Sequence, residues 1–154
     1  MTPQELSKMY GINLYATNLN LAGITHQESL VAPQPGGNCL NWNLGHIVAS
    51  RADVLKLVGE APVWSEEEGK PYARGSKSWD PGKARTLDTI VQDLERSQER
   101  LEKALTSMAP ERLNEVQGDK PLGEKLAVLQ FHEGYHIGQI GLLRRLLGKA
   151  GAIA

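Results

Sequence analysis

The feature that most constrains the fold of this 154-residue chain is a segment of strong helical periodicity in its third quarter. Charged residues fill the positions between apolar residues that recur at spacings of three and four: Leu87, Ile90, Val91, Leu94, Leu101 and Leu105. Such spacing is typical of an amphipathic helix that buries one face. It predicts a helix that ends near Ser107. No segment shows the alternation expected of a half-exposed strand, so the chain is predicted to be all-α.

Three further helices are predicted from signals at their ends. Thr2-Pro3-Gln4-Glu5 combines a capping box with a proline at the first helical position, so a first helix is expected to run to about residue 23. A second helix is expected from about Leu40 to Val58, where Gly59 provides a C-terminal cap. The last helix is expected from about Leu122 to Leu147.

The connections between these helices indicate the topology. Residues 25–38 contain two prolines and a Gly-Gly pair and are expected to form a loop. Residues 60–84 carry three prolines and three glycines without a sustained period, which favours a long connection over a regular element. The prediction is therefore one domain, residues 1–154, folded as a four-helix bundle. A crossover between the second and third helices would let those two helices run parallel.

Composition excludes several classes of partner. Lys+Arg 17 against Asp+Glu 18 gives a net charge of -1, so the chain lacks the positive field that drives nucleic-acid binding. No apolar run approaches the roughly 20 residues needed to cross a bilayer. The single cysteine, Cys39, rules out an internal disulfide, and the N-terminus lacks the pattern of a secretion signal. A cytoplasmic protein that binds neither nucleic acid nor membrane is expected.

The stretch HEGYH, residues 132–136, matches the H-E-x-x-H signature of zinc proteases. On a helix of about 100° per residue, His132 and His136 lie about 40° apart in the middle of the core-facing stripe. The protease pattern fails in its context, because Gln139 and Leu142 stand where a longer motif needs glycine and histidine. No Asp or Glu follows His136 to act as a third ligand. Proteolysis is therefore not expected.

A third ligand is expected from His46 on the second helix. Two histidines at positions i and i+4 present both imidazoles to one side of a helix, at a separation that one metal ion can bridge. With His46 facing the same interior, three imidazoles would occupy three corners of a tetrahedron and leave the fourth open, as in catalytic zinc sites. The alternative is that these histidines are buried structural residues and that the bundle holds no metal.

The motifs that carry the histidines resemble those of a known family. NWNLGHI (41–47), followed after a long interval by FHEGYHIGQIGLLRRLLG (131–148), is similar to the DinB / YfiT-like family of metalloenzymes. The resemblance extends over essentially the whole chain. It implies a four-helix bundle with a crossover, commonly a homodimer, with a divalent metal held by His46, His132 and His136. Zinc and nickel are the metals it implies.

The resemblance also suggests a chemistry, because relatives include thiol-dependent S-transferases and an isomerase that uses a low-molecular-weight thiol. The leading hypothesis is therefore a metal-dependent transferase that acts on a small molecule with a thiol as cosubstrate. Hydrolysis by a metal-activated water is the neighbouring variant. A non-catalytic, metal-stabilised helical dimer that serves as a binding module is the alternative.

Two carboxylates are candidates for a catalytic role, Glu133 and Asp53. Either could orient a ligand imidazole or move a proton. The competing interpretations are a solvated carboxylate and a charge involved in helix packing. Gln139, one turn beyond His136, is a candidate polar neighbour of the ligands, Trp42 and Tyr135 are expected to pack, and His26 is assigned no role.

A ridge of small residues lies on the last helix opposite the histidines: Gly123, Ala127, Gly134, Gly138 and Gly141. Each helical glycine costs about 1 kcal/mol relative to alanine, so a row of them indicates a closely packed neighbour. That neighbour is expected to be a helix, either within the bundle or from a second subunit.

Overall fold

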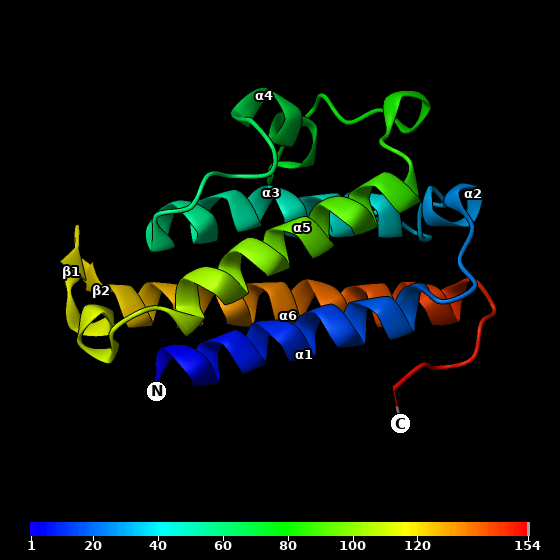
Figure 1. The fold of residues 1–154 in the computed structure, drawn as a ribbon. Helices are drawn as coiled ribbons and strands as arrows, with labels where there is room; N and C mark the ends of the chain where they lie inside the picture. Colours follow the sequence, from blue (N-terminus) through cyan, green and yellow to red (C-terminus); the bar gives the residue numbers. More distant parts are fainter. Residues whose placement is uncertain (154) are drawn as a thin grey trace.

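Four long helices form at the positions that periodicity and capping predict (Figure 1). The computed structural model describes residues 1–153. The Thr2–Glu5 capping box is present at the start of the first helix, and Gly59, with φ 86°, caps the second in the left-handed conformation. The long helices are α1 (Pro3–Leu21), α3 (Leu40–Val58), α5 (Leu87–Thr106) and α6 (Leu122–Leu146).

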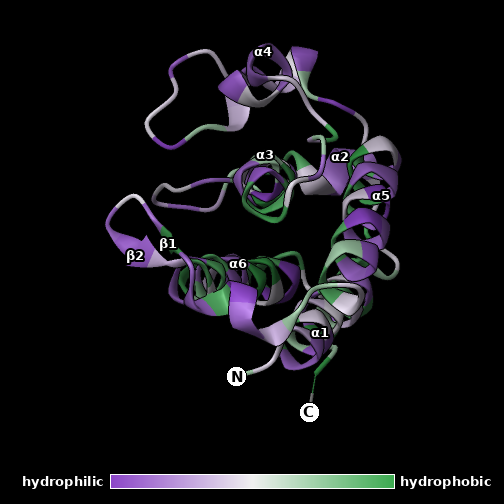
Figure 2. Cartoon of the chain, turned by 60° about the vertical axis from the view of Figure 1, so that its left-hand side comes forward, coloured by the Kyte–Doolittle hydropathy of each residue, from purple (hydrophilic) through white to green (hydrophobic). Residues whose placement is uncertain are grey.

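The helices pack as a bundle in which each has two neighbours. α3 lies between α5 and α6, and α1 completes the ring on the opposite side. Following the colours in Figure 1, α3 and α5 run in one direction and α1 and α6 in the other. The prediction that the crossover lets its two flanking helices run parallel is confirmed. Figure 2 looks closer to the bundle axis and shows that the crossover, with α4, lies outside α3.

The two segments predicted to be irregular contain short elements. Residues 25–38, predicted as a loop, include α2 (His26–Ser29), which begins at a Thr25 capping box. The crossover contains α4 (Glu66–Gly69), the 3-10 turn η1 (Lys70–Tyr72) and the 3-10 turn η2 (Pro81–Lys83). Each is a single turn stabilised by a local cap or a proline. A single turn is too short to show an apolar period, so the sequence did not predict it.

The prediction that the chain contains no strand is wrong, because one small hairpin is present in the otherwise helical fold. After the 3-10 turn η3 (Pro110–Asn114), β1 (Val116–Gln117) pairs antiparallel with β2 (Lys120–Pro121) around Gly118. Each strand has two residues, too few for an alternating pattern to be visible in the sequence. The hairpin leads the chain from α5 into α6.

Most glycines of α6 face neighbours within the same chain, but a Cβ built on Gly138 would meet nothing within 4 Å in the described residues. A Cβ built on Gly141 would lie 3.2 Å from Oδ1 of Asn20, and one on Gly134 would lie 3.9 Å from Oδ1 of Asn13, both on α1. Gly123 packs instead against Leu113 of η3. Of the two neighbours left open by the sequence, the helix within the bundle is the one found for Gly134 and Gly141. The homodimer stays a prediction.

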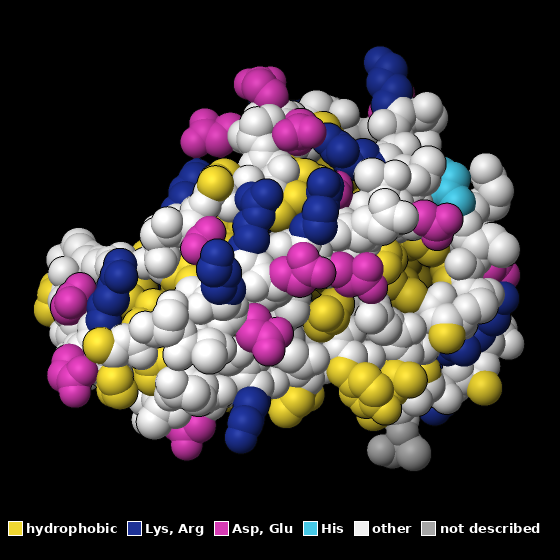
Figure 3. Space-filling model, viewed as in Figure 1, with side chains coloured by type: hydrophobic (Ala, Val, Ile, Leu, Met, Phe, Trp, Pro, Cys, Tyr) yellow, Lys and Arg dark blue, Asp and Glu magenta, His cyan; other side chains and the backbone are white. Residues whose placement is uncertain are grey.

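The surface carries charges of both signs. In the face drawn in Figure 3, lysine and arginine side chains are interspersed with aspartate and glutamate, as the net charge of -1 leads one to expect. Among the helices formed by residues 1–153, none has both the length and the apolar character required to span a membrane.

Candidate metal centre

Three histidines from two helices converge inside the bundle. Nε2 of His132 lies 3.2 Å from Nε2 of His46 and 3.2 Å from Nε2 of His136. All three ligand atoms lie within 4.8 Å of one another. Zinc–nitrogen bonds of about 2.0–2.1 Å in a tetrahedral arrangement would place two ligand nitrogens roughly 3.3–3.4 Å apart. The two separations of 3.2 Å therefore fit a single ion shared by His132 with each of the other two rings.

Hydrogen bonds fix the tautomers of two rings. Nδ1 of His46 donates to the backbone carbonyl of Tyr72 at 2.7 Å. Nδ1 of His136 lies 2.9 Å from Oδ1 of Asn43, whose amide nitrogen donates to the carbonyls of Asn38 and Cys39 and so leaves that oxygen to accept. Because both rings carry their proton on Nδ1, both Nε2 atoms point lone pairs into the centre.

Without a cation, this arrangement of lone pairs is unfavourable. A neutral His132 has one proton, which can sit on Nε2 among the three nitrogens or on Nδ1. Nδ1 of His132 is buried and has no hydrogen-bond partner within residues 1–153. In either tautomer the Nε2 lone pairs of His46 and His136 still converge. A cation at the centre would bind all three lone pairs.

Two of the three rings are held in the neutral form that binds metal. Burial lowers the pKa of His46 below its usual range. Burial, together with the neighbouring rings of His46 and His132, lowers the pKa of His136 to about 4. At neutral pH the rings of His46 and His136 therefore present neutral nitrogen donors, the form that metal coordination requires.

The NWNLGHI segment builds the wall behind His46. The indole of Trp42 stacks on the ring of His46, with centroids 4.8 Å apart and planes 8° from parallel. Gly45 leaves space for the ring of Tyr72, because a Cβ at this position would overlap that ring. Asn41 accepts a hydrogen bond from the Tyr72 hydroxyl at 3.4 Å and donates to the carbonyl of Arg85 at 3.0 Å. The polar residues of this segment thus hold the crossover against the metal centre.

The crossover is anchored at a second point by a buried aromatic residue. Nε1 of Trp64 donates to Oδ2 of Asp93 on α5 at 2.6 Å, and both side chains are buried. The guanidinium of Arg85 lies 4.8 Å above the Trp64 ring. Trp64 in turn packs against Tyr72, whose carbonyl orients His46. The crossover, which has only single helical turns, is therefore fixed closely enough to position a candidate ligand.

Sequence comparison identifies the family. A family model described as the DinB superfamily matches residues 15–140, more than half of the chain. The chain belongs to the DinB superfamily. No curated protein matches it in a sequence search. The matched region of this DinB-superfamily chain includes His46, His132 and His136, and the mostly helical fold agrees with the assignment.

In this DinB-superfamily chain, the two candidate carboxylates pair with arginine or lysine rather than with the three histidines. Glu133 is buried, and both of its oxygens accept from Arg51 of α3, at 2.5 and 2.8 Å. Asp53 is exposed and lies 3.8 Å from the ammonium of Lys56. Neither carboxylate hydrogen-bonds a ligand imidazole. A role for either in moving a proton stays a prediction.

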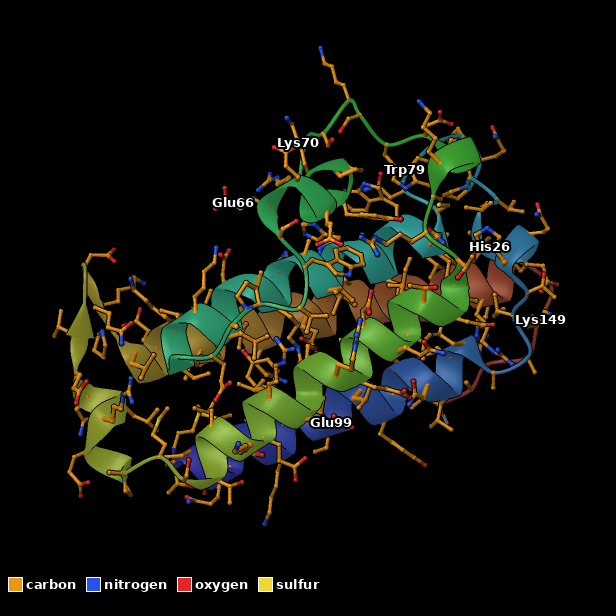
Figure 4. The ribbon with its side chains drawn as sticks, turned by 45° about the horizontal axis from the view of Figure 1, so that its top comes forward. His26, Glu66, Lys70, Trp79, Glu99 and Lys149 are labelled. Atoms are coloured by element: carbon orange, nitrogen blue, oxygen red, sulfur yellow. The ribbon has the colours of Figure 1, made fainter. Side chains whose placement is uncertain are left out.

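The remaining candidates occupy supporting positions. Nε2 of Gln139 lies 3.4 Å from the Tyr135 hydroxyl, and Oε1 of Gln139 is buried without a partner within the described part of the chain. Cys39 is buried, and its sulfur caps α3 by accepting from the amide of Trp42. Nδ1 of His26 accepts from the amide of Leu87 at 3.3 Å, at the start of α5 (Figure 4). This contact is structural, and His26 is not part of the three-histidine cluster.

Sequence reasoning missed Arg51 and Tyr72. Arg51 lies three residues from Val48 and from Val54 within the buried stripe of α3, and a charge at such a position is a signal for a buried partner. Tyr72 gave no signal, because its contribution is a backbone carbonyl in a single 3-10 turn. Asn43 was on the same side of its helix as His46, but its partner could not be inferred.

Asn43→Ala is expected to weaken metal binding about 10- to 100-fold, because the outer partner of a ligand imidazole fixes its tautomer and orientation. Affinity would be measured by competition with a chromogenic chelator. Asn38→Ala is the matched control, since only its backbone carbonyl contacts Asn43. Equal affinities in the wild type and Asn43→Ala would show that His136 is oriented without this bond.

Proposed function

We propose that this DinB-superfamily protein is a divalent-metal-dependent enzyme that transfers a low-molecular-weight thiol to a small electrophile. The observation that carries the proposal is the convergence of three Nε2 lone pairs from His46, His132 and His136. Within the described residues the metal-binding cluster contains no fourth protein ligand. Three protein ligands with an open position are the arrangement of catalytic sites, whereas structural sites are closed by four.

The residues of the chain have defined tasks in this proposal. His46, His132 and His136 hold zinc or nickel, and three imidazoles do not choose between these metals. Asn43 and the Tyr72 carbonyl orient two of the rings, and Trp42 covers the face of His46. A bound divalent cation supplies a Lewis acid that lowers the pKa of a thiol or a water molecule. No protein nucleophile is required.

A groove between α3 and α6 offers space for the body of the substrate. A cavity of about 550 Å³ has an apolar floor that includes Leu57 and Leu129 and extends to Val128, one helical turn before His132. Three ammonium groups lie around it, from Lys56, Lys120 and Lys125, with Asp53 and Gln117. Each of these ammonium groups already lies beside a carboxylate, because Lys56 pairs with Asp53, Lys120 with Glu124 and Lys125 with Asp119. The apolar floor therefore favours a partly apolar molecule. None of the three histidines lines this groove, so we assign to it only the part of the substrate that lies away from the reacting centre.

The experiment that tests the function is conjugation of a fluorogenic alkyl halide with glutathione or cysteine. The zinc- or nickel-loaded protein is expected to accelerate this reaction, whereas metal-free protein and the metal-loaded His46→Ala variant should show at least a tenfold lower rate. His26→Ala, which changes a histidine outside the centre, is the control. An unchanged rate in His46→Ala would refute the mechanism.

Other outcomes identify the alternatives. Metal-dependent cleavage of a nitrophenyl ester without thiol conjugation would favour the hydrolase variant. Tight metal binding with neither reaction would favour a non-catalytic, metal-stabilised binding module. A metal content below about 0.1 equivalent in protein purified without a histidine tag, with no uptake of zinc or nickel, would exclude both metal hypotheses.

A further inference from the structure

A layer of buried polar side chains divides the core of the bundle. One apolar cluster contains Leu44, Ile47 and Val48 of α3, and the other contains Val54, Leu55 and Val58 of the same helix. α5 is divided in the same way between Leu94 and Leu101, and α6 between Leu126 and Ile137. The side chains between the two clusters are therefore at the centre of the molecule, at the level of the metal ligands of α6.

Each of the four long helices contributes one side chain to this layer. The guanidinium of Arg51 (α3) donates from Nε and Nη2 to the carboxylate of Glu133 (α6), and from Nη1 to Oε1 of Gln98 (α5) at 3.0 Å. It also lies 4.7 Å above the ring of Tyr10 (α1). Arg51 is 1% exposed and Glu133 is 4% exposed. The charge is fully buried and fully paired.

Stability alone does not explain such a network. Moving both charges out of water carries a large cost, and apolar residues of similar volume often support a fold equally well or better. A bidentate pair also constrains how two helices are placed. Its two parallel hydrogen bonds fix both the rotation and the axial position of one helix against the other. Buried polar residues are known to set the register between helices in this way.

The register between α3 and α6 is the one that the metal centre needs. His46 comes five residues before Arg51 on α3, whereas His132 and His136 flank Glu133 on α6. The ligand set is therefore divided between the two helices that the ion pair joins. Metal–ligand distances tolerate deviations of only about 0.2 Å. A small slide of α6 along α3 would separate His46 from the other two ligands.

We infer that Arg51 and Glu133 are positioning residues that set the α3–α6 register and thereby the geometry of the three-histidine site. Glu133 of the HEGYH motif acts here through Arg51, in a role unlike that of the glutamate in the proteases with the same motif. The inference rests on the metal-binding part of the proposed function. It does not depend on the reaction catalysed.

The test removes the polar network that is inferred to set the register, and it leaves no unpaired charge in the core. The triple variant Arg51→Met, Gln98→Leu, Glu133→Leu replaces the network with apolar side chains of similar size. It is expected to fold, with far-UV circular dichroism and a thermal midpoint no lower than those of the wild type. Its affinity for zinc should nevertheless fall at least tenfold, and the visible spectrum of its cobalt-loaded form should change. Ser97→Ala, a buried serine of α5 that bonds only within its own helix, is the control.

A second readout needs no metal. In metal-free wild type, nitrogen NMR should show His46 and His136 as Nδ1–H tautomers, whereas the triple variant should show mixtures. Wild-type tautomers and wild-type zinc affinity in the triple variant would overturn the inference. If the wild type itself bound no zinc, nickel or cobalt, the proposed function would fail, yet the tautomers would still test the register.

A conservative variant covers the case in which the triple variant unfolds. Arg51→Lys keeps the buried charge but replaces a rigid two-pronged donor with a single ammonium group. It should show the same changes in zinc affinity and cobalt spectrum, with a loss of at least threefold. A folded Arg51→Lys protein with unchanged affinity and spectrum would count against the inference.

Discussion

His132→Ala is expected to lower the affinity for zinc or nickel on the order of 100-fold or more. Structural zinc sites bind with roughly 10–16 kcal/mol of free energy shared among four ligands, so one ligand contributes about 3 kcal/mol, or about 100-fold. His132 is the central ring of the three, because its Nε2 lies 3.2 Å from both of the others. Its loss leaves two donors from two different helices.

The measurement is metal content after dialysis, followed by titration calorimetry. The fold should survive, because His132 is partly exposed and its Nδ1 has no partner within residues 1–153 to lose. His26→Ala is the matched control, since His26 contacts only the start of α5 through its ring nitrogen and should leave metal content unchanged. Equal metal content in His132→Ala and wild type would mean that the ion binds elsewhere.

Gly45→Ala is expected to have the second large effect, on both stability and metal binding. The added methyl group would overlap the ring of Tyr72, which is buried and held by contacts with Asn41, Arg85 and Trp64. Overpacking of this kind costs about 1–3 kcal/mol. Relief of the overlap requires Tyr72 to move, and its carbonyl is the partner of Nδ1 of His46. Metal affinity should therefore fall about 10- to 100-fold.

Denaturant unfolding and chelator competition would measure the two effects of Gly45→Ala. Gly11→Ala is the matched control, because Gly11 lies within α1 and an added Cβ would meet only Nε2 of Gln98, at 3.9 Å. Alanine is favoured over glycine in a helix by about 1 kcal/mol, so this control should be neutral or more stable. If Gly45→Ala had the same stability and metal affinity as Gly11→Ala, Tyr72 would be shown to adjust without moving its carbonyl.

The sequence predicted the parts of the fold that local chemistry controls. The Thr2–Glu5 capping box, the Gly59 cap and the leucine spacing of α5 depend only on neighbours within a few residues, and all three are found. The spacing of His132 and His136 depends on one helix alone. The long crossover also predicted the parallel course of α3 and α5, because its length permits that path. Short turns such as α2 and α4 were missed, since a single turn has no period to detect.

The partners of the site residues were decided only by the tertiary structure. The sequence indicated that His46 faces the interior with the later pair, but it could not show that Glu133 binds Arg51 or that Asn43 orients His136. These contacts join residues 82 and 93 positions apart, and Tyr72 reaches His46 from a 3-10 turn of the crossover. Local propensity determines where a helix forms and which face is apolar. The rotation and register of one helix against another depend on packing across the whole core, and these decide which polar groups meet.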